Sequence, residues 1–466
     1  MITSMQKPSV ISTETPLIPP PLPIIKGWPL LGALPALLKD PFGFLTRARE
    51  KQGDIYTLNL GFIKLVILNH PRHAQQVLRD NAQNYYKGGA IWQAVRGLTG
   101  NGLILSEGDF WLRQRRLMQP QFHRQRLAAL TSLMVEAIDQ ALKTWEPITQ
   151  QAKPFDLLPA FNQLTMCVVA KTLFGTALTA AELTEVSEIM PFAINYVMVD
   201  AATKALPAWL PIPGKRRYQQ VLARFDEIIY RIIADGRRSA GKENHLLAML
   251  LDAVDEETGV GMDDRQLRDE VATLFLAGYE TTAAALAWAF HYLTSHPETM
   301  QKLQAEVDSV LDGRQPTFAD LPNLAYARMV FQEVLRLRPV SFWTPRTAMH
   351  DDTIDGYPIP AGTHVASFTY MYHHHPAIWS EPTHFDPGRF TPERSAGRHP
   401  FAWIPFSAGQ RLCIGRDFSL MEGQLALAMV VQRYQLAPVA GHTPKLRLGA
   451  TLRPVGGVQV KVVQRT

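Results

Sequence analysis

The sequence contains little cysteine, no long apolar run near its N-terminus and no cluster of like charges. Two cysteines, Cys167 and Cys413, cannot build a disulfide framework in a chain of 466 residues. Residues 1–17 mix polar side chains with prolines, which excludes a signal peptide or a transmembrane anchor in that segment. Basic side chains number 47 and acidic ones 42, without long runs of one sign, so nucleic acid is not the expected partner. We therefore expect a cytoplasmic, unanchored protein.

The chain also lacks internal repeats and any Gly/Ser-rich linker that would divide it. Residues 16–23 are prolines and aliphatic residues, a composition that favours an extended polyproline arm. We expect a tail and Pro-rich arm over residues 1–23 and a single domain over residues 24–466. A monomer is the expected oligomeric state.

Helical periodicity dominates from about Asp109 to Arg338, with segments near 129–146, 158–174, 217–238 and 262–296. The last segment is unusually long. Asp263 or Asp264 can cap it and Pro297 ends it, so about 33 residues would span about 50 Å and cross the core. Three further elements are expected: a hairpin of residues 55–60 and 63–68, short strands after Arg338 such as 363–368, and a final helix over 416–433. These patterns predict a mainly α fold with a small β-rich part.

One cysteine lies directly before the final predicted helix, within Phe406 to Gly415. A Cys413 thiolate would face unpaired backbone N–H groups and the positive end of the helix dipole, which stabilise negative sulfur. Gly409 permits a turn barred to other residues, Gly415 allows close approach of a flat partner, and Arg411 offers donors for a carboxylate. A lone cysteine suits haem iron better than zinc, because porphyrin supplies the remaining in-plane ligands. On these residues alone, a buried structural cysteine is an equal alternative.

The segment also fits Phe-x-x-Gly-x-Arg-x-Cys-x-Gly at all five fixed positions. It resembles the haem-binding signature of the cytochromes P450, and the resemblance runs from about Pro19 to Val463 through four further motifs. It implies the cytochrome P450 fold, with a long helix crossing one haem domain, and haem b with Cys413 as its axial metal ligand. The expected contacts of the cofactor in this loop are Phe406, Gly409, Arg411, Cys413 and Gly415.

Trp111 and Arg115 lie four residues apart, so on a helix they share a face. This spacing resembles the family's Trp-x-x-x-Arg, which implies that both bind one haem propionate. Arg346 matches a second propionate-binding arginine, and Arg411 a third.

Glu333 and Arg336 share a helix face at i and i+3. They resemble the family's buried Glu-x-x-Arg pair, and Arg389 in Phe385-Asp386-Pro387-Gly388-Arg389-Phe390 matches its third member. The resemblance implies structural support for the cysteine loop. Nearby, His373, His374 and His375 stand where the family often has His-Arg-Asp, and we interpret them as surface or loop residues.

The long helix carries Ala277-Gly278-Tyr279-Glu280-Thr281-Thr282. Small residues at 277 and 278 thin one face of the helix, so a flat ligand could lie against Ala277. Thr281 can donate a hydroxyl and Glu280 can relay protons. A kinked helix with hydroxyls bonded back to carbonyls is the alternative. The segment resembles the family's oxygen-activation motif, which implies that Glu280 and Thr281 deliver protons to bound dioxygen.

The resemblance implies a monooxygenase that oxidises a lipophilic substrate with dioxygen. The alternatives are a P450-type isomerase or a peroxygenase that needs no external electrons, and a non-catalytic haem-binding sensor or electron-transfer protein. The Glu280–Thr281 pair argues against the first two, which do not need proton delivery to dioxygen. Too few residues follow Cys413 for a flavin or ferredoxin domain. We therefore expect electrons from a separate ferredoxin or flavodoxin and its reductase, docked around the Cys413 loop.

Residues at matching family positions suggest a mostly apolar substrate pocket without a charge clamp. This favours a terpenoid, a steroid or a fatty acyl chain. An apolar loop over residues 206–213 could form a lid that also touches a membrane. The candidate pocket residues are Ile91, Trp92, Phe192, Phe275, Val340, Phe342 and Thr451.

Overall fold

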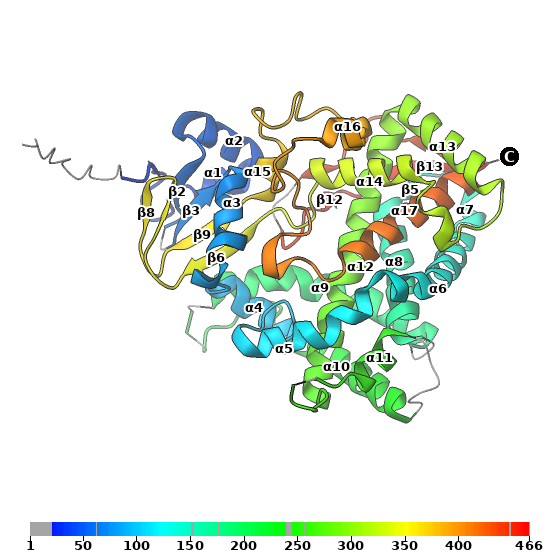
Figure 1. Cartoon of the computed structure of the whole chain (residues 1–466), viewed down its shortest axis with the longest axis horizontal. Coiled ribbons are helices and arrows are strands. Elements are labelled where there is room, and N and C mark those ends of the chain that lie inside the picture. Colours follow the sequence, from blue (N-terminus) through cyan, green and yellow to red (C-terminus); the bar gives the residue numbers. More distant parts are fainter. Residues whose placement is uncertain are drawn as a thin grey trace, which may run out of the picture.

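The computed structural model describes residues 21–61, 63–150, 153–175, 178–204, 206–207, 209–238, 245–255, 257–446 and 449–465, so most of the predicted Pro-rich arm lies outside the described residues. Helices form the larger part of the molecule, and the main sheet lies at one end (Figure 1). This confirms the mainly α fold with a small β-rich part. The longer helices are α2 (Pro41–Gln52), α4 (Ala90–Thr99), α5 (Gly108–Met118), α6 (Arg124–Lys143), α8 (Leu157–Phe174), α9 (Ala180–Thr203), α10 (Lys215–Arg238), α12 (Asp264–Ser295), α13 (Pro297–Leu311), α14 (Ala325–Leu337) and α17 (Arg416–Arg433).

Helix α12 is the long helix that the sequence predicts. Its cap is Asp263, whose side chain accepts the N–H of Gln266 at 2.7 Å, and Pro297 begins the next helix. Nearly every residue from Thr282 to Leu293 is buried, and five alanines in this stretch let neighbouring helices approach closely. The helix therefore runs through the core, where α8, α14 and α17 pack against it (Figure 1).

Helix α8 is long and apolar enough to cross a membrane, with a mean hydropathy of 1.3 over 18 residues. However, 67% of that window is buried inside the protein, between α6 and α12. The hydroxyl of Thr165 on α8 donates to the carbonyl of Tyr279 on α12 at 2.8 Å. Helix α8 is thus a core helix of this fold. Cys167 on the same helix is half-buried, and burial raises the pKa of its thiol.

The main sheet has six strands in the order β1 (Ile24–Ile25), β2 (Ile55–Asn59), β3 (Lys64–Leu68), β9 (His364–Ser367), β6 (Thr344–Ala348) and β4 (Tyr85–Tyr86). Strands β2 and β3 pair antiparallel, with Ile55 opposite Leu68, which confirms the predicted hairpin. Strand β9 lies parallel to β3 and antiparallel to β6. The sheet thereby positions β6, which carries Arg346.

Smaller elements complete the described chain. A three-stranded sheet joins the C-terminal strands to the start of α8, in the order β10 (Tyr434–Pro438), β13 (Gln459–Gln464) and β5 (Phe155–Asp156). The two-stranded ladders are β7 (Asp352–Ile354) with β8 (Tyr357–Ile359) and β11 (Lys445–Leu446) with β12 (Pro454–Val455). The short α-helices are α1 (Leu34–Lys39), α3 (Pro71–Gln75), α7 (Glu146–Thr149), α11 (Leu246–Asp252), α15 (Thr369–His373) and α16 (Pro392–Ser395).

Candidate active site

The loop before α17 is shaped by one glycine and one backbone hydrogen bond. Cys413 N–H donates to the carbonyl of Phe406 at 3.0 Å, which closes the loop across its base. Gly409 has φ +67°, and a Cβ at this position would lie 1.8 Å from the carbonyl oxygen of Leu78. No other residue type fits such a close approach to backbone in this conformation. The predicted role of Gly409 in the turn is confirmed.

The side chain of Cys413 combines accessible surface with the electrostatic effect of burial. Burial raises the pKa of its thiol, opposed by the Gly415 N–H and by the positive charges of Arg115 and Arg416. A side chain on the outer surface would not show this effect of burial. The sulfur thus keeps accessible surface although the surrounding protein shields it from bulk water.

Helix α12 presents a second open patch among buried residues. Ala277 is exposed, although Leu276 and Tyr279 beside it are buried. The hydroxyl of Thr281 donates to the carbonyl of Ala277 at 2.6 Å, the back-bonded arrangement weighed as the alternative from sequence. Gly278 serves a different purpose from the predicted one. A Cβ there would lie 2.9 Å from a methyl carbon of Val169, so this glycine allows α8 to pack against α12.

Glu280 is nearly buried and is held by two groups from the segment before β12. Its carboxylate accepts the hydroxyl of Thr451 at 3.0 Å and lies 3.5 Å from the guanidinium of Arg453. Burial raises the pKa of Glu280, whereas the charge of Arg453 and the Thr451 hydroxyl lower it. Arg453 also donates to Asn195 of α9 at 2.5 Å, and its side chain is 30% exposed. A polar path therefore connects Glu280 with the protein surface.

Four cationic side chains and one carboxylate gather near the cysteine loop. Burial lowers the pKa of Arg346 to about 10, partly offset by the attraction of Glu107, and Arg411 repels it further. Burial also lowers the pKa of Arg411. It lowers the pKa of Lys87 strongly, and the positive charges of Arg346 and Arg411 lower it further. The pKa of Arg115 is lowered by burial. Among the described residues, Glu107 is the carboxylate that attracts Arg346, Arg411 and Lys87, so the cluster holds excess positive charge.

Hydrogen bonds fix this cluster to the loops that surround it. Arg115 donates to the carbonyl of Leu412 at 2.9 Å, and Arg411 donates to Ser106 O at 2.7 Å and pairs with Glu107. The guanidinium of Arg411 lies 4.1 Å from the ring centroid of Trp111. The predicted set of Trp111, Arg115 and Arg411 is therefore brought together around the cysteine loop.

These residues fit a haem. The accessible sulfur of Cys413 suits the iron, the open patch at Ala277 suits a flat apolar ring, and the excess of positive charge suits the propionates of that cofactor.

The comparisons with known proteins agree. The family model described as Cytochrome P450 matches residues 19–462. The chain is a cytochrome P450. It is 36% identical to cyclooctat-9-en-7-ol 5-monooxygenase from Streptomyces melanosporofaciens, over 89% of each protein. It is 30% identical to pentalenene oxygenase from Streptomyces avermitilis, over 92% of this chain and 96% of the relative. The crystal structure of the cytochrome P450DA haem domain superimposes with a TM-score of 0.88 at 26% identity, covering 96% of this chain and 99% of that one.

This P450 is accordingly a haem-thiolate monooxygenase, whose reaction requires a substrate, dioxygen and a source of electrons.

The predicted structural triad of this P450 is assembled and buried. Glu333 and Arg336 have no exposed side-chain surface, and the Arg336 guanidinium makes two 2.7 Å hydrogen bonds to the Glu333 carboxylate. Arg389 lies 3.3 Å from the same carboxylate, which also accepts the N–H of Asp386. Arg336 further donates to three backbone carbonyls. The desolvation cost of the buried charges is thus offset by several partners.

The interpretation of the three histidines as surface or loop residues holds for His374 and His375, which follow α15 in a loop, although His375 is buried there. It is wrong for His373, which is the last residue of α15 and is buried. His373 is fully buried because both ring nitrogens have backbone partners: Nδ1 lies 3.1 Å from the carbonyl of Arg336, and Nε2 accepts the N–H of Ile404 at 3.0 Å. Burial and the charge of Arg336 lower the pKa of His373 to about 3. A neutral His373 therefore links α14 to the segment that leads into the cysteine loop.

The predicted substrate pocket is only partly consistent with the structure. Phe275 packs among Phe174, Phe225 and Tyr279. Because it precedes Ala277 by two positions in the sequence, it lies on the opposite side of α12 from Ala277. Phe342 and Val340 are also core residues, with exposures of 2% and 5%.

The other predicted pocket residues retain accessible surface. Ile91 and Trp92 on α4 are half-buried, as are Phe192 on α9 and Thr451. The indole of Trp92 donates to Pro345 O, and the guanidinium of Arg217 lies 4.4 Å from the Phe192 ring centroid.

Three polar residues of the site were not predicted from the sequence. Lys87 and Glu107 belong to the cationic cluster, and Arg453 pairs with Glu280. Lys87 donates to the carbonyl of Ile104, and its ammonium lies 5.2 Å from the ring centroid of Trp92. None of them lies in a spacing motif, and each is recognisable only from partners distant in the sequence.

Proposed function

We propose that Cys413 is the axial ligand of the haem and that Trp111, Arg115, Arg346 and Arg411 hold its propionates. When bound, haem supplies the iron at which dioxygen is activated and one oxygen atom is transferred. The observation that carries the proposal is that the Cys413 sulfur keeps accessible surface although burial raises its pKa, and that Arg115 and a cluster with excess positive charge lie near it. In this arrangement Phe406, Gly409 and Gly415 shape the loop, and Ala277 leaves room for the ring.

Glu280 and Thr281 deliver protons in this scheme. The Glu280 carboxyl can take a proton along the path of Arg453 and Thr451 and pass it towards the hydroxyl of Thr281. Thr281 donates to Ala277 O, which leaves its oxygen free to accept a hydrogen bond and orients the hydroxyl on the open face of α12.

The substrate of this P450 is a lipophilic molecule of the terpenoid class. Two relatives that match over most of their length are named for oxidations of cyclooctat-9-en-7-ol and pentalenene. The half-buried apolar side chains of Ile91, Trp92 and Phe192 suit such a ligand. Steroids and fatty acids are the comparison compounds in the assay below.

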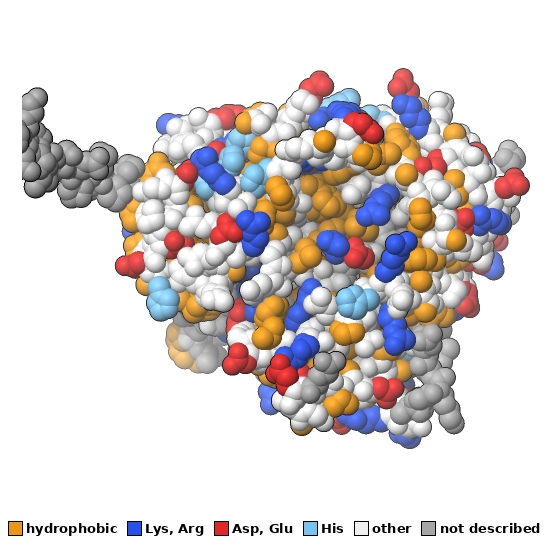
Figure 2. Space-filling view, viewed as in Figure 1, with side chains coloured by type: hydrophobic (Ala, Val, Ile, Leu, Met, Phe, Trp, Pro, Cys, Tyr) orange, Lys and Arg blue, Asp and Glu red, His pale blue; other side chains and the backbone are white. Residues whose placement is uncertain are grey.

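Electrons come from an acidic ferredoxin or flavodoxin that docks around the Cys413 loop. Figure 2 shows Lys and Arg side chains scattered over the face on which α5, α14 and α17 lie. Such a face attracts an acidic protein, and the encounter slows as ionic strength rises. Arg416→Glu should slow reduction by a surrogate ferredoxin, whereas Lys51→Glu on α2 should not. Equal rates in both variants would contradict this docking face.

The protein is a cytoplasmic monomer with peripheral contact to lipid. Trp28, Leu30 and Trp209 are 70%, 82% and 80% exposed, large apolar surfaces for a protein that contacts only water. Trp209 belongs to the predicted lid segment of residues 206–213, of which Ala208 lies outside the described residues.

The deciding experiment supplies isotopically labelled dioxygen, NADPH, a surrogate ferredoxin and its reductase to the holoenzyme. A panel of terpenoid alcohols and hydrocarbons, steroids and fatty acids serves as substrates. One labelled oxygen atom in a terpenoid product supports the proposal. A product without label, or one formed without the electron donor, would favour an isomerase or peroxygenase. The absorption spectrum of the ferric protein is recorded with each compound as well. If none of them shifts the spin state of the haem, the result would favour a non-catalytic haem-binding sensor.

A further inference from the structure

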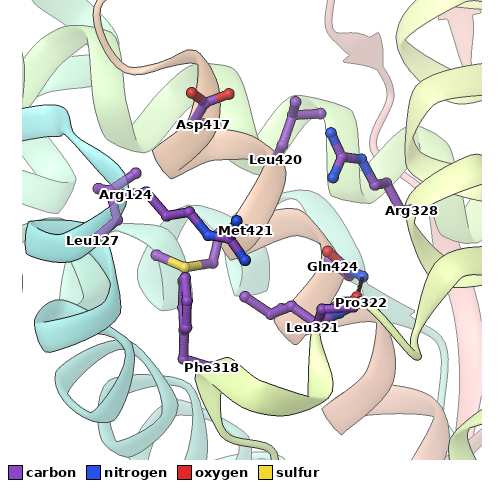
Figure 3. Close-up of a pocket in the computed structure, with 10 residues that line it drawn as sticks. All are labelled: Arg124, Leu127, Phe318, Leu321, Pro322, Arg328, Asp417, Leu420, Met421 and Gln424. Atoms are coloured by element: carbon purple, nitrogen blue, oxygen red, sulfur yellow. Dashed lines mark hydrogen bonds between the residues drawn. The ribbon is translucent and has the colours of Figure 1, made fainter.

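A cavity of about 330 Å³ opens between the start of α6, the η4 turn (Phe318–Asp320), α14 and the first turns of α17 (Figure 3). None of the residues assigned to the haem lines it. Its volume lies at the lower end of the range for small-molecule sites.

The floor of the cavity is apolar and deeply buried. Leu127 comes from α6, and Leu420 and Met421 come from α17, with exposures of 4%, 7% and 5%. Phe318 and Leu321 add apolar surface from the η4 turn and the residue after it. A ligand with an apolar body would therefore leave water for hydrophobic surroundings at the base of the cavity.

The wall formed by the η4 turn is held rigidly before any ligand binds. The Gln424 amide donates to the carbonyls of Leu321 and Leu324, both at 2.7 Å. Arg314 makes two hydrogen bonds to Asp320, at 2.6 and 2.7 Å, and Asp320 also caps the turn. A preformed wall lowers the ordering cost of binding.

The rim carries more positive than negative charge. Arg124 and Arg328 approach the cavity from opposite sides in Figure 3, and both side chains are exposed. Within the described chain neither guanidinium has an ion-pair partner. Asp417, the carboxylate on the rim, is paired with Arg416 at 2.9 Å. The guanidinium of Arg124 lies 5.7 Å from the ring centroid of Phe318, which keeps it near the opening.

We propose that this cavity binds a small amphiphilic carboxylate, with its apolar body on the Leu127–Met421 floor and its anionic group between Arg124 and Arg328. Guanidinium groups match the planar geometry of a carboxylate, and the floor selects against fully polar anions. This pocket is concave and preformed and has a buried base. It therefore suits a small molecule better than it suits a protein partner, whose contact surface is flatter. The site is independent of the function proposed for the haem pocket.

The test uses the holoenzyme in its reduced, carbon monoxide-bound form, labelled with ¹³C at the methionine methyl groups. Met421→Leu assigns the resonance of Met421, which lines this cavity and is not among the residues assigned to the haem. Decanoate is the probe, and decan-1-ol is its uncharged match. We expect decanoate to shift the Met421 resonance saturably. The double substitution Arg124→Gln/Arg328→Gln should weaken binding about tenfold or more, since it removes two charged hydrogen-bond donors.

Arg126→Gln is the control, because this exposed arginine lies on α6 outside the cavity lining. Its decanoate affinity should equal that of the wild type, and decan-1-ol should bind similarly weakly to all variants. A Met421 resonance that does not respond to decanoate overturns the proposal. The same holds if the double variant binds decanoate as tightly as the wild type. Slower reduction by the electron donor in the double variant, without decanoate binding to the wild type, would instead assign the cavity to that protein partner.

Discussion

Replacing Glu280 by glutamine removes the proposed proton carrier while preserving its shape. The amide oxygen can still accept the Thr451 hydroxyl that lies 3.0 Å from the carboxylate. Arg453 loses its counter-charge at 3.5 Å, but it is 30% exposed and can be solvated, so the loss of stability should stay below about 1 kcal/mol. Proton transfer by a positioned side chain typically contributes about 100-fold to 10,000-fold, or roughly 3–5 kcal/mol of barrier. We expect product formation from dioxygen to fall by this factor.

The assay compares two routes to product in wild type and Glu280→Gln. With dioxygen and an electron donor, the variant should be slow and should release more hydrogen peroxide per product. With added hydrogen peroxide, which brings its own protons, the two proteins should differ much less. A variant as fast as wild type with dioxygen would refute the role of Glu280. An equal loss by both routes would mean that the residue acts on structure and not on proton delivery.

Three further predictions concern stability. Glu333→Ala leaves Arg336 buried without its carboxylate, which should cost about 3–5 kcal/mol in urea unfolding, whereas a loss under about 1 kcal/mol would mean that the triad contributes little. Gly409→Ala should cost at least about 1–2 kcal/mol from its positive φ and lower the haem content; full haem loading would contradict the close approach to Leu78. Burial raises the pKa of Glu422 from 4.5 to about 8, so the folded state holds this proton more tightly and the unfolding free energy should fall as pH rises between these values. Glu422→Gln should flatten that slope, and an unchanged slope would show that another group causes it.

Helices with clear boundary signals were predictable from sequence. Asp263 and Pro297 delimit α12, and the final helix was placed at the residues where α17 lies. The cysteine loop was equally accessible, because Gly409 is required by backbone geometry that any sequence for this loop must satisfy.

Features that depend on distant partners were not predictable. His373 is buried because Arg336 and Ile404, far away in the sequence, offer a carbonyl and an N–H to its ring. Arg453 gains its position from Glu280 in the same way. Phe275 was misplaced because a list of family positions does not say which side of a helix each residue occupies. Lys87, Glu107 and Arg453 lie in no local pattern that reveals their tertiary partners, unlike the Glu333–Arg336 pair, whose spacing does.

The central claim is that Cys413 binds the haem iron, and the absorption spectrum of the dithionite-reduced protein with carbon monoxide tests it most directly. We predict a strongly red-shifted Soret band in the wild type, produced by thiolate ligation, and its loss in Cys413→Ala. Cys167→Ala, the matched control at the other cysteine, should keep the band. A protein without haem, or a band that survives in Cys413→Ala, would contradict the account.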